Sequence, residues 1–177
     1  MRRAVFLDRD GVINQAVVIN GKSYPPATLS DFVYLPGVEK YIKRLRAADF
    51  LVIVVTNQPD VATGIQTREV VDSMHEKLRK DLLCDDIKVC FHIDEDGCDC
   101  RKPKPGMLIE AARQWEINLR ESFMVGDRWR DVGAGKAAGC FTYFIDNKYQ
   151  EKPPDRPDKI VLSLEDASKH ILQQLNF

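Results

Sequence analysis

Short apolar runs recur along this chain, and each ends in polar or glycine residues before a stretch of helical periodicity begins. The runs lie at 4–7, 51–55, 87–92, 123–125, 140–145 and 160–162. Continuous apolar runs of this length are typical of strands that are buried on both faces in a parallel sheet. Strands that alternate with helices form such sheets through right-handed crossovers. We therefore predict an α/β fold with a doubly wound, mainly parallel sheet.

The intervals between these runs carry helix signals. Thr67 is placed to cap one helix, Pro105 lies in the first turn of another, and Ser163 is placed to cap the last. Two intervals contain prolines and no clear period. We expect a long polar connection at 15–35 and a surface loop at 147–158.

The composition is typical of a soluble globular protein. The 177 residues are 44% hydrophobic and 30% charged, with a formal net charge of −1. That length suits a single domain over residues 1–177, and we expect a monomer. A near-neutral chain without a basic stripe gives no signal for a nucleic-acid partner, and no apolar run is long enough to span a membrane. Met1-Arg2-Arg3 leads directly into the first apolar run, which does not resemble a signal peptide.

The cysteines predict a metal site. There are five, and three of them lie between positions 90 and 100. An odd, clustered set suits a metal site in a reducing compartment better than a disulfide framework, so we expect a cytoplasmic location. Three thiolates and one imidazole would complete a tetrahedral shell around a structural Zn²⁺. The candidate ligands are Cys90, His92, Cys98 and Cys100. The alternative is a set of free thiols beside a surface histidine.

Polar side chains follow three of the predicted strands. Asp8 and Asp10 come directly after the first, and Gly11 then turns the chain. Thr56-Asn57 and Asp127 follow two others. Ligands of open α/β sheets bind beyond the carboxyl ends of the strands, so we expect these groups near one site. Asp and Gly are also ordinary turn residues, and the set therefore carries more weight than any one member.

Two further segments supply positive charge. Arg101-Lys102 lies in a proline-containing loop directly after Cys100, and Arg128 follows Asp127. Cations at these places could neutralise a phosphate, although a basic loop is often only solvated. We expect Asn57, Arg101 and Arg128 to contact the substrate. His75, on a predicted helix, is expected to be solvated.

As an ordered set, these motifs resemble the haloacid-dehalogenase (HAD) superfamily of phosphatases. Within it, Asp8-Arg9-Asp10-Gly11-Val12-Ile13-Asn14 and Cys100-Arg101-Lys102-Pro103 resemble the heptose-bisphosphate phosphatases most. The histidinol-phosphatases are close relatives of that family. The resemblance covers nearly the whole chain and implies a Rossmann-like, HAD-like fold with a zinc loop. It also implies a small phosphorylated sugar as substrate.

The resemblance implies roles that agree with the chemistry. Asp8 would attack phosphorus to form an aspartyl-phosphate, and Asp10 would act as general acid and then general base. Mg²⁺ would be held by the Asp8 side chain, the Asp10 backbone carbonyl and Asp127. Thr56 and Lys102 would bind the oxygens of the transferring phosphoryl group.

Some positions depart from the usual pattern of that family. Pro59-Asp60 stands where Ser-Gly is common, Thr63 replaces a common arginine, and Arg128 replaces a frequent lysine. These changes affect recognition beyond the reacting phosphate. The segments 15–50 and 59–86 leave no room for a large cap domain, so we expect an open site. Histidinol phosphate and a nucleic-acid 3′-phosphate stay open as substrates. A non-catalytic binding module is a third possibility, against which the retention of both aspartates argues.

Overall fold

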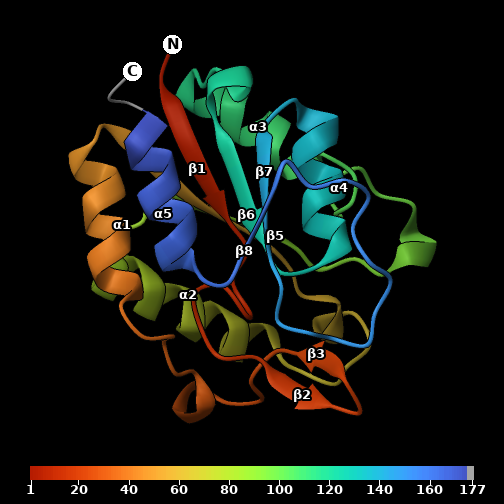
Figure 1. The fold of residues 1–177 in the computed structure, drawn as a ribbon. Coiled ribbons are helices and arrows are strands. Elements are labelled where there is room, and N and C mark those ends of the chain that lie inside the picture. Colours follow the sequence, from red (N-terminus) through yellow and green to blue (C-terminus); the bar gives the residue numbers. More distant parts are fainter. Residues whose placement is uncertain (175–177) are drawn as a thin grey trace.

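A computed structural model describes residues 1–174 of the chain (Figure 1). Its main strands are β1 (Arg3–Leu7), β4 (Phe50–Asn57), β5 (Asp86–Cys90), β6 (Phe123–Gly126), β7 (Phe141–Ile145) and β8 (Lys159–Val161). They form a six-stranded sheet in the order β5-β4-β1-β6-β7-β8, and every neighbouring pair is parallel. The predicted parallel sheet is confirmed.

Helices cover both faces of this sheet, as a doubly wound fold requires (Figure 1). They are α1 (Val38–Ala47), α2 (Arg68–Leu82), α3 (Gly106–Trp115), α4 (Trp129–Ala138) and α5 (Leu164–Gln173). Helices α1, α2 and α5 pack on one face, and α3 and α4 on the other. Both predicted caps are confirmed: the Thr67 side chain accepts a hydrogen bond from Val70 N, and that of Ser163 from Asp166 N. None of these helices is long and apolar enough to cross a membrane.

Strand β1 shows why the apolar runs are continuous. Val5 and Leu7 pack into the core on the α1 side, whereas Ala4 and Phe6 pack into the core on the α3 side. All four are fully buried. Burying a large apolar side chain contributes roughly 1.5–3 kcal/mol, so a polar residue on either face of β1 would be costly.

The segment 15–35 differs from the expectation of an aperiodic polar connection. It contains a β-hairpin of β2 (Val17–Ile19) and β3 (Lys22–Tyr24). The turn residues Asn20 and Gly21 have φ values of 50° and 74°. Positive φ at both central positions is the type I′ geometry that Asn-Gly favours in two-residue hairpins. The prediction was wrong here because strands of three residues are too short to show a period-two pattern.

The sheet order brings the site together. Strand β1 lies between β4 and β6. The chain runs from β1 outward through β4 and β5, and then returns to β6 and proceeds to β7 and β8 on the other side. Such a reversal of strand order opens a crevice beyond the carboxyl ends. The residues after β1, β4 and β6 therefore meet there.

Candidate active site

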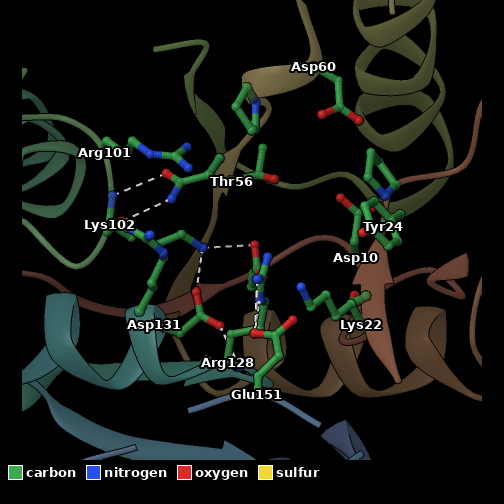
Figure 2. A pocket seen from close by; sticks show the side chains of 16 residues that line it. Asp10, Lys22, Tyr24, Thr56, Asp60, Arg101, Lys102, Arg128, Asp131 and Glu151 are labelled. Carbon is green, nitrogen blue, oxygen red and sulfur yellow. Dashed lines mark hydrogen bonds and ion pairs between the residues drawn. The ribbon is translucent and has the colours of Figure 1, made fainter. Parts of the chain in front are cut away.

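Three carboxylates lie at this crevice: Asp8 after β1, Asp127 after β6 and Asp131 in the first turn of α4. One oxygen from each lies within 4.8 Å of the others. All three residues are buried. Lys102 reaches into the cluster, and its Nζ donates hydrogen bonds to Asp8 Oδ1 at 2.8 Å and to Asp131 Oδ1 at 2.5 Å (Figure 2). Asp131 also accepts a bond from the backbone N–H of Arg128, which caps α4.

Lys102 is held in place by β4. Its Nζ donates a third bond to Val55 O at 2.8 Å. The Asn57 side chain makes two hydrogen bonds with the Lys102 backbone. Asn57 Nδ2 donates to the Lys102 carbonyl oxygen at 3.1 Å, and the Lys102 backbone N–H donates to Asn57 Oδ1 at 3.1 Å. Asn57 therefore positions Lys102, and its direct contact with a substrate stays a prediction.

The carboxylate cluster carries more negative charge than its lysine can balance. Burial, with the neighbouring Asp131, raises the pKa of Asp8 to about 6, although Lys102 opposes this shift. Burial and the charge of Asp8 raise the pKa of Asp127 well above its usual value. Three carboxylates and one ammonium leave two negative charges. Asp127 Oδ1 is buried without a hydrogen-bond partner among residues 1–174. A divalent cation with oxygen ligands, such as Mg²⁺, fits both observations.

The turn after β1 is tight. Gly11 has φ of +82°, and a Cβ there would lie 1.8 Å from Asp127 Oδ2. Any side chain would push Asp127 away, so glycine is required by both backbone conformation and space. The turn thereby brings the ends of β1 and β6 into contact.

Asp10 lies outside the carboxylate cluster. Its carboxylate accepts bonds from Arg9 Nη2 at 3.0 Å, Asn14 Nδ2 at 2.9 Å and Gln58 Nε2 at 2.8 Å. Two carboxylates two residues apart thus have different surroundings. Asp8 contacts the buried lysine, and Asp10 is held by an arginine and two amides at the edge of the cavity.

His75 corrects an expectation. It was expected to be solvated, but it is 2% exposed on α2. Arg9, which is fully buried, donates to His75 Nε2 at 3.2 Å. Burial and then the Arg9 charge lower the pKa of His75 to about 3, so the ring is neutral and can accept this bond. His75 lies next to the buried Val71 and Met74, so the buried face of α2 includes a polar position beside its apolar ones.

A cavity of about 220 Å³ opens above Asp8 and Asp10 (Figure 2). Thr56 is buried in its wall and accepts a bond from Gln58 Nε2 at 2.9 Å. The other predicted contacts also line the cavity: Asn57, Arg101, Lys102 and Arg128. Arg128 pairs with Glu151 at 2.9 Å. Arg101 pairs with Asp94 at 2.8 Å, and its Nη1 is buried without a partner among the described residues.

Two chain segments contribute lining residues that the sequence interpretation missed. The β2–β3 hairpin supplies Lys22 and Tyr24, and the loop after β7 supplies Glu151. Pro59 and Asp60, the positions that depart from the resembling family, also line the cavity. The Asn-Gly turn could have revealed the hairpin, but nothing local indicates that it folds over the strand ends.

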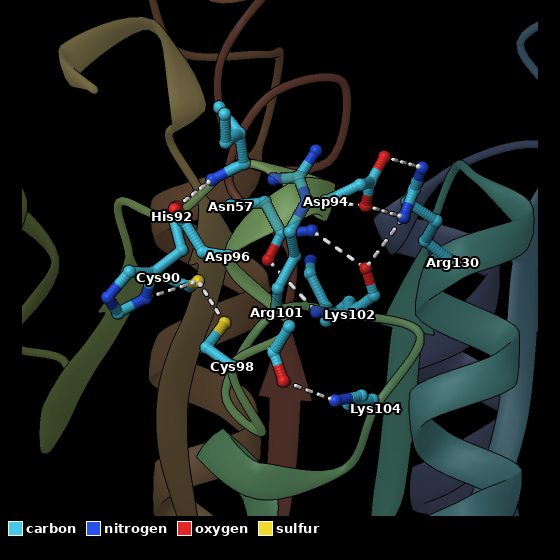
Figure 3. A network of polar contacts seen from close by, with 12 residues as sticks. Asn57, Cys90, His92, Asp94, Asp96, Cys98, Arg101, Lys102, Lys104 and Arg130 are labelled. Atoms are coloured by element: carbon cyan, nitrogen blue, oxygen red, sulfur yellow. Dashed lines mark hydrogen bonds and ion pairs between the residues drawn. The ribbon is translucent and has the colours of Figure 1, made fainter. Parts of the chain in front are cut away.

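The cysteine loop lies beside this cavity (Figure 3). The ligand atoms of Cys90, His92, Cys98 and Cys100 all lie within 4.8 Å of one another. The three sulfur atoms are 3.1–3.7 Å apart, and all three cysteines are free thiols. Sulfur ligands of a tetrahedral zinc lie about 3.8 Å apart, given Zn–S bonds of about 2.3 Å. The donor set therefore fits Zn²⁺.

The cysteine loop is also linked to the basic side chains of the site. Asp94, within the loop, accepts bonds from Arg101 Nε at 2.8 Å and from Arg130 Nη2 at 2.8 Å (Figure 3). Arg130 in turn donates to the Lys102 carbonyl at 3.2 Å. The loop thus holds Arg101 directly and supports the Lys102 backbone through Arg130.

Comparison with known proteins places this arrangement in a family. A HAD-hydrolase-like family model matches residues 99–167. The D-glycero-beta-D-manno-heptose-1,7-bisphosphate 7-phosphatase of Bordetella bronchiseptica is 36% identical over 148 residues, covering 81% of this chain and 80% of that protein. The enzyme of the same name from Pseudomonas aeruginosa is 37% identical over 145 residues, covering 78% of each chain.

A solved structure agrees with these relatives. The crystal structure of D,D-heptose 1,7-bisphosphate phosphatase from B. bronchiseptica, complexed with magnesium and phosphate, matches with a TM-score of 0.83. It is 30% identical and covers 97% of this chain and 99% of its own. The chain therefore belongs to the D-glycero-β-D-manno-heptose-1,7-bisphosphate 7-phosphatase family of HAD-like hydrolases.

Proposed function

We propose that this phosphatase hydrolyses D-glycero-D-manno-heptose 1,7-bisphosphate at the 7-phosphate through an aspartyl-phosphate on Asp8. The observation that carries this proposal is the different placement of Asp8 and Asp10. Asp8 lies in a buried carboxylate cluster beside Lys102, whereas Asp10 is held separately beside the same cavity. Nucleophilic attack and proton transfer require two such carboxyl groups in different surroundings.

Asp8 attacks phosphorus, and the bond from phosphorus to the sugar oxygen breaks. The Asp10 carboxyl gives its proton to that oxygen, which leaves as the sugar hydroxyl. Asp10 then takes a proton from water as the water attacks the aspartyl-phosphate, which releases inorganic phosphate and restores Asp8. Arg9, Asn14 and Gln58 hold the Asp10 carboxylate for both transfers. Such acid–base catalysis is typically worth about 10²–10⁴-fold.

Mg²⁺ would be held by Asp8, Asp127 and the Asp10 backbone carbonyl, with Asp131 beside them. When bound, it offsets the repulsion between the phosphate dianion and the attacking carboxylate. Lys102 keeps a positive charge next to Asp8, and Thr56 offers a hydroxyl at the end of β4. Both are placed to stabilise phosphoryl oxygens, where charge must be balanced throughout the transfer.

The charges that line the cavity indicate that the substrate carries a second anionic group. Arg101, Lys102, Arg128 and Arg130 each pair with a carboxylate. Lys22 also lines the cavity and has no ion-pair partner among residues 1–174. Its side chain extends from the hairpin into the cavity (Figure 2). A free ammonium there suits the distal phosphate of a bisphosphate.

One observation favours a second candidate. Asp60 lines the cavity near Asp10, where the resembling family commonly has glycine. A carboxylate at this place attracts an amine, and histidinol phosphate carries one. Histidinol phosphate is therefore the main competing substrate.

The test is a comparison of kcat/KM for purified enzyme with Mg²⁺ across a substrate panel. The panel holds both anomers of the heptose 1,7-bisphosphate, the heptose 7-phosphate, histidinol phosphate, a 3′-phosphorylated oligonucleotide and an aryl phosphate. We expect the highest value for one heptose bisphosphate anomer. A higher kcat/KM for histidinol phosphate would identify histidinol phosphate as the substrate, and the proposed mechanism would still hold. Failure to hydrolyse any member would support the non-catalytic binding module.

We also infer that Cys90, His92, Cys98 and Cys100 hold a structural Zn²⁺. Four protein ligands leave no position for water or substrate, so the ion would act only by fixing the loop. The monomeric state, the single domain over 1–177 and the cytoplasmic location stay predictions, which gel filtration, limited proteolysis and fractionation would test.

A further inference from the structure

The first part of the loop after β7 reaches the carboxylate cluster. We call residues 146–151 the strap. Residues 147–151 of the strap belong to the segment 147–158 that was expected to be a surface loop. Asn147 Nδ2 lies 3.1 Å from Asp127 Oδ2 and 3.1 Å from the carbonyl oxygen of Gly11. Asn147 Nδ2 also donates to the Tyr149 hydroxyl at 3.2 Å, so Tyr149 helps to hold the Asn147 side chain.

The two carboxylate oxygens of Asp127 have different hydrogen-bond partners. Oδ2 accepts from the strap, whereas Oδ1 is buried with no hydrogen-bond partner among residues 1–174. A carboxylate held at one oxygen cannot rotate freely, so its other oxygen keeps one direction. Because Asn147 also holds Gly11 O, the strap fixes the turn that follows Asp10 relative to the end of β6.

The strap is itself anchored on the hairpin. Gln150 N donates to Gly21 O at 2.7 Å. The Gln150 side chain also packs closely against Gly21. Ser23 is buried although most of the hairpin is exposed. The hairpin that presents Lys22 and the strap that holds Asp127 therefore form one connected unit.

We propose that Asn147 and Tyr149 are positioning residues that orient Asp127 Oδ1 toward the divalent cation. This inference rests on the proposed role of Asp127 as a Mg²⁺ ligand. Groups that hydrogen-bond to a metal ligand orient it, and their loss typically lowers metal affinity about 10–100-fold. Asn147→Ala should weaken Mg²⁺ binding by about that factor, and Tyr149→Phe by less, because Asn147 also holds the Gly11 carbonyl.

The experiment is isothermal titration of Mg²⁺ into substrate-free protein. It compares wild type with Asn147→Ala, Tyr149→Phe and Asp127→Asn. Lys148→Ala is the matched control, since Lys148 lies between the two strap residues and its side chain is 79% exposed and pairs with Asp146. The Mg²⁺ concentration for half-maximal turnover and the melting temperature are measured on the same preparations.

The expected result is weaker Mg²⁺ binding by Asn147→Ala and Tyr149→Phe, no change in Lys148→Ala, and recovery of kcat in Asn147→Ala at high Mg²⁺. A merely structural role would lower the melting temperature and leave the Mg²⁺ dependence unchanged. Mg²⁺ affinity within twofold of wild type in Asn147→Ala would overturn the proposal if Asp127→Asn binds weakly. Wild-type Mg²⁺ affinity in Asp127→Asn would instead overturn the ligand role of Asp127, and with it this inference.

Discussion

The carboxylate cluster and the cysteine cluster are both compact groups of metal-binding side chains, but the fold assembles them in different ways. The four zinc-ligand candidates lie between positions 90 and 100, at the end of β5 and in the loop that follows it. Cys90 is buried, His92 is exposed, and Cys98 and Cys100 are partly exposed. The carboxylates come from positions 8, 127 and 131, and all three are buried. The end of one strand and the short loop after it can organise the first cluster. The second exists only when β1 and β6 pair, so its geometry depends on the whole sheet.

The two clusters also differ in what they leave unsatisfied. The cysteine site offers four ligands and a closed shell, which suits a tightly held ion without a catalytic role. The carboxylate site has two negative charges in excess, and Oδ1 of Asp127 is buried with no hydrogen-bond partner in the described part of the chain, residues 1–174. Such a site suits an exchangeable hard cation whose remaining positions go to water and phosphate. We therefore expect the cysteine site to hold a structural metal and the carboxylate site to hold a catalytic one.

The largest expected effect is that of Asp8→Asn. It removes the nucleophile and should lower kcat by at least about 10⁴-fold, as the loss of a nucleophile does in other enzymes. Removing one of three crowded buried carboxylates should leave the melting temperature equal or higher. The measurement is steady-state kinetics beside thermal unfolding. Wild-type kcat in folded Asp8→Asn protein would remove Asp8 from the mechanism.

Chelation should separate the two metals. Brief treatment with a chelator should lower turnover on the order of 10³-fold, since charge stabilisation by a divalent ion is worth several kcal/mol. Mg²⁺ alone should restore activity, and the zinc content should not change. Metal analysis of the same samples checks this. Full activity in metal-free buffer would show that Mg²⁺ is not needed for turnover. Recovery only with zinc would show that zinc is the catalytic metal.

Cys98→Ser tests the cysteine cluster without touching a carboxylate. Loss of zinc should loosen the loop that places Arg101 and Lys102, and misplacement by an ångström costs on the order of 10²-fold in kcat/KM. The melting temperature should fall, and added Mg²⁺ should not rescue activity. Cys140→Ser is the control, because Cys140 is a buried free thiol outside the cluster. Unchanged kinetics and stability in a zinc-free Cys98→Ser protein would contradict the structural role.

The smallest expected effect is that of Lys22→Ala, which lies in neither cluster. It should raise KM for the bisphosphate about tenfold, the value of roughly one charge-assisted hydrogen bond. KM for the 7-monophosphate should change little, because the reacting phosphate lies at Asp8. Equal effects on both substrates would show that Lys22 does not contact the distal phosphate. Lys148→Ala, whose side chain is exposed and pairs with Asp146, serves as the control.

The same contrast explains what could be predicted from the sequence. The apolar runs indicate strands that are buried on both faces, so the parallel sheet was predictable. The helix caps at Thr67 and Ser163 were predictable from residue type and position. Cys90 to Cys100 could be grouped from spacing alone, because their contacts are local. Asp131 lies near the start of a helix, where a carboxylate complements the helix N-terminus, and it does cap α4 by accepting a bond from the Arg128 amide. Its second contact, with Lys102, joins residues far apart in the chain and left no local pattern.

The strap and the hairpin were missed for a related reason. Prolines and the lack of a period in 147–158 predicted a surface loop, and much of that segment is exposed. The contact of Asn147 with Asp127 depends on how β7 ends beside β6, which spacing does not encode. His75 was misplaced because its buried partner, Arg9, lies in a different element.

The aspartyl-phosphate mechanism on Asp8 is tested most directly by trapping the covalent intermediate. Asp10→Asn removes the base that activates water, so enzyme phosphorylated on Asp8 should accumulate with a substrate whose leaving group needs little protonation, such as an aryl phosphate. The reaction is quenched in acid, and the peptides are mapped by mass spectrometry. We expect phosphate on the peptide that contains Asp8, dependent on Mg²⁺ and absent when Asp8 is also replaced by Asn. Phosphate on another residue, or turnover by Asp10→Asn at the wild-type rate with no phosphorylated enzyme, would contradict it.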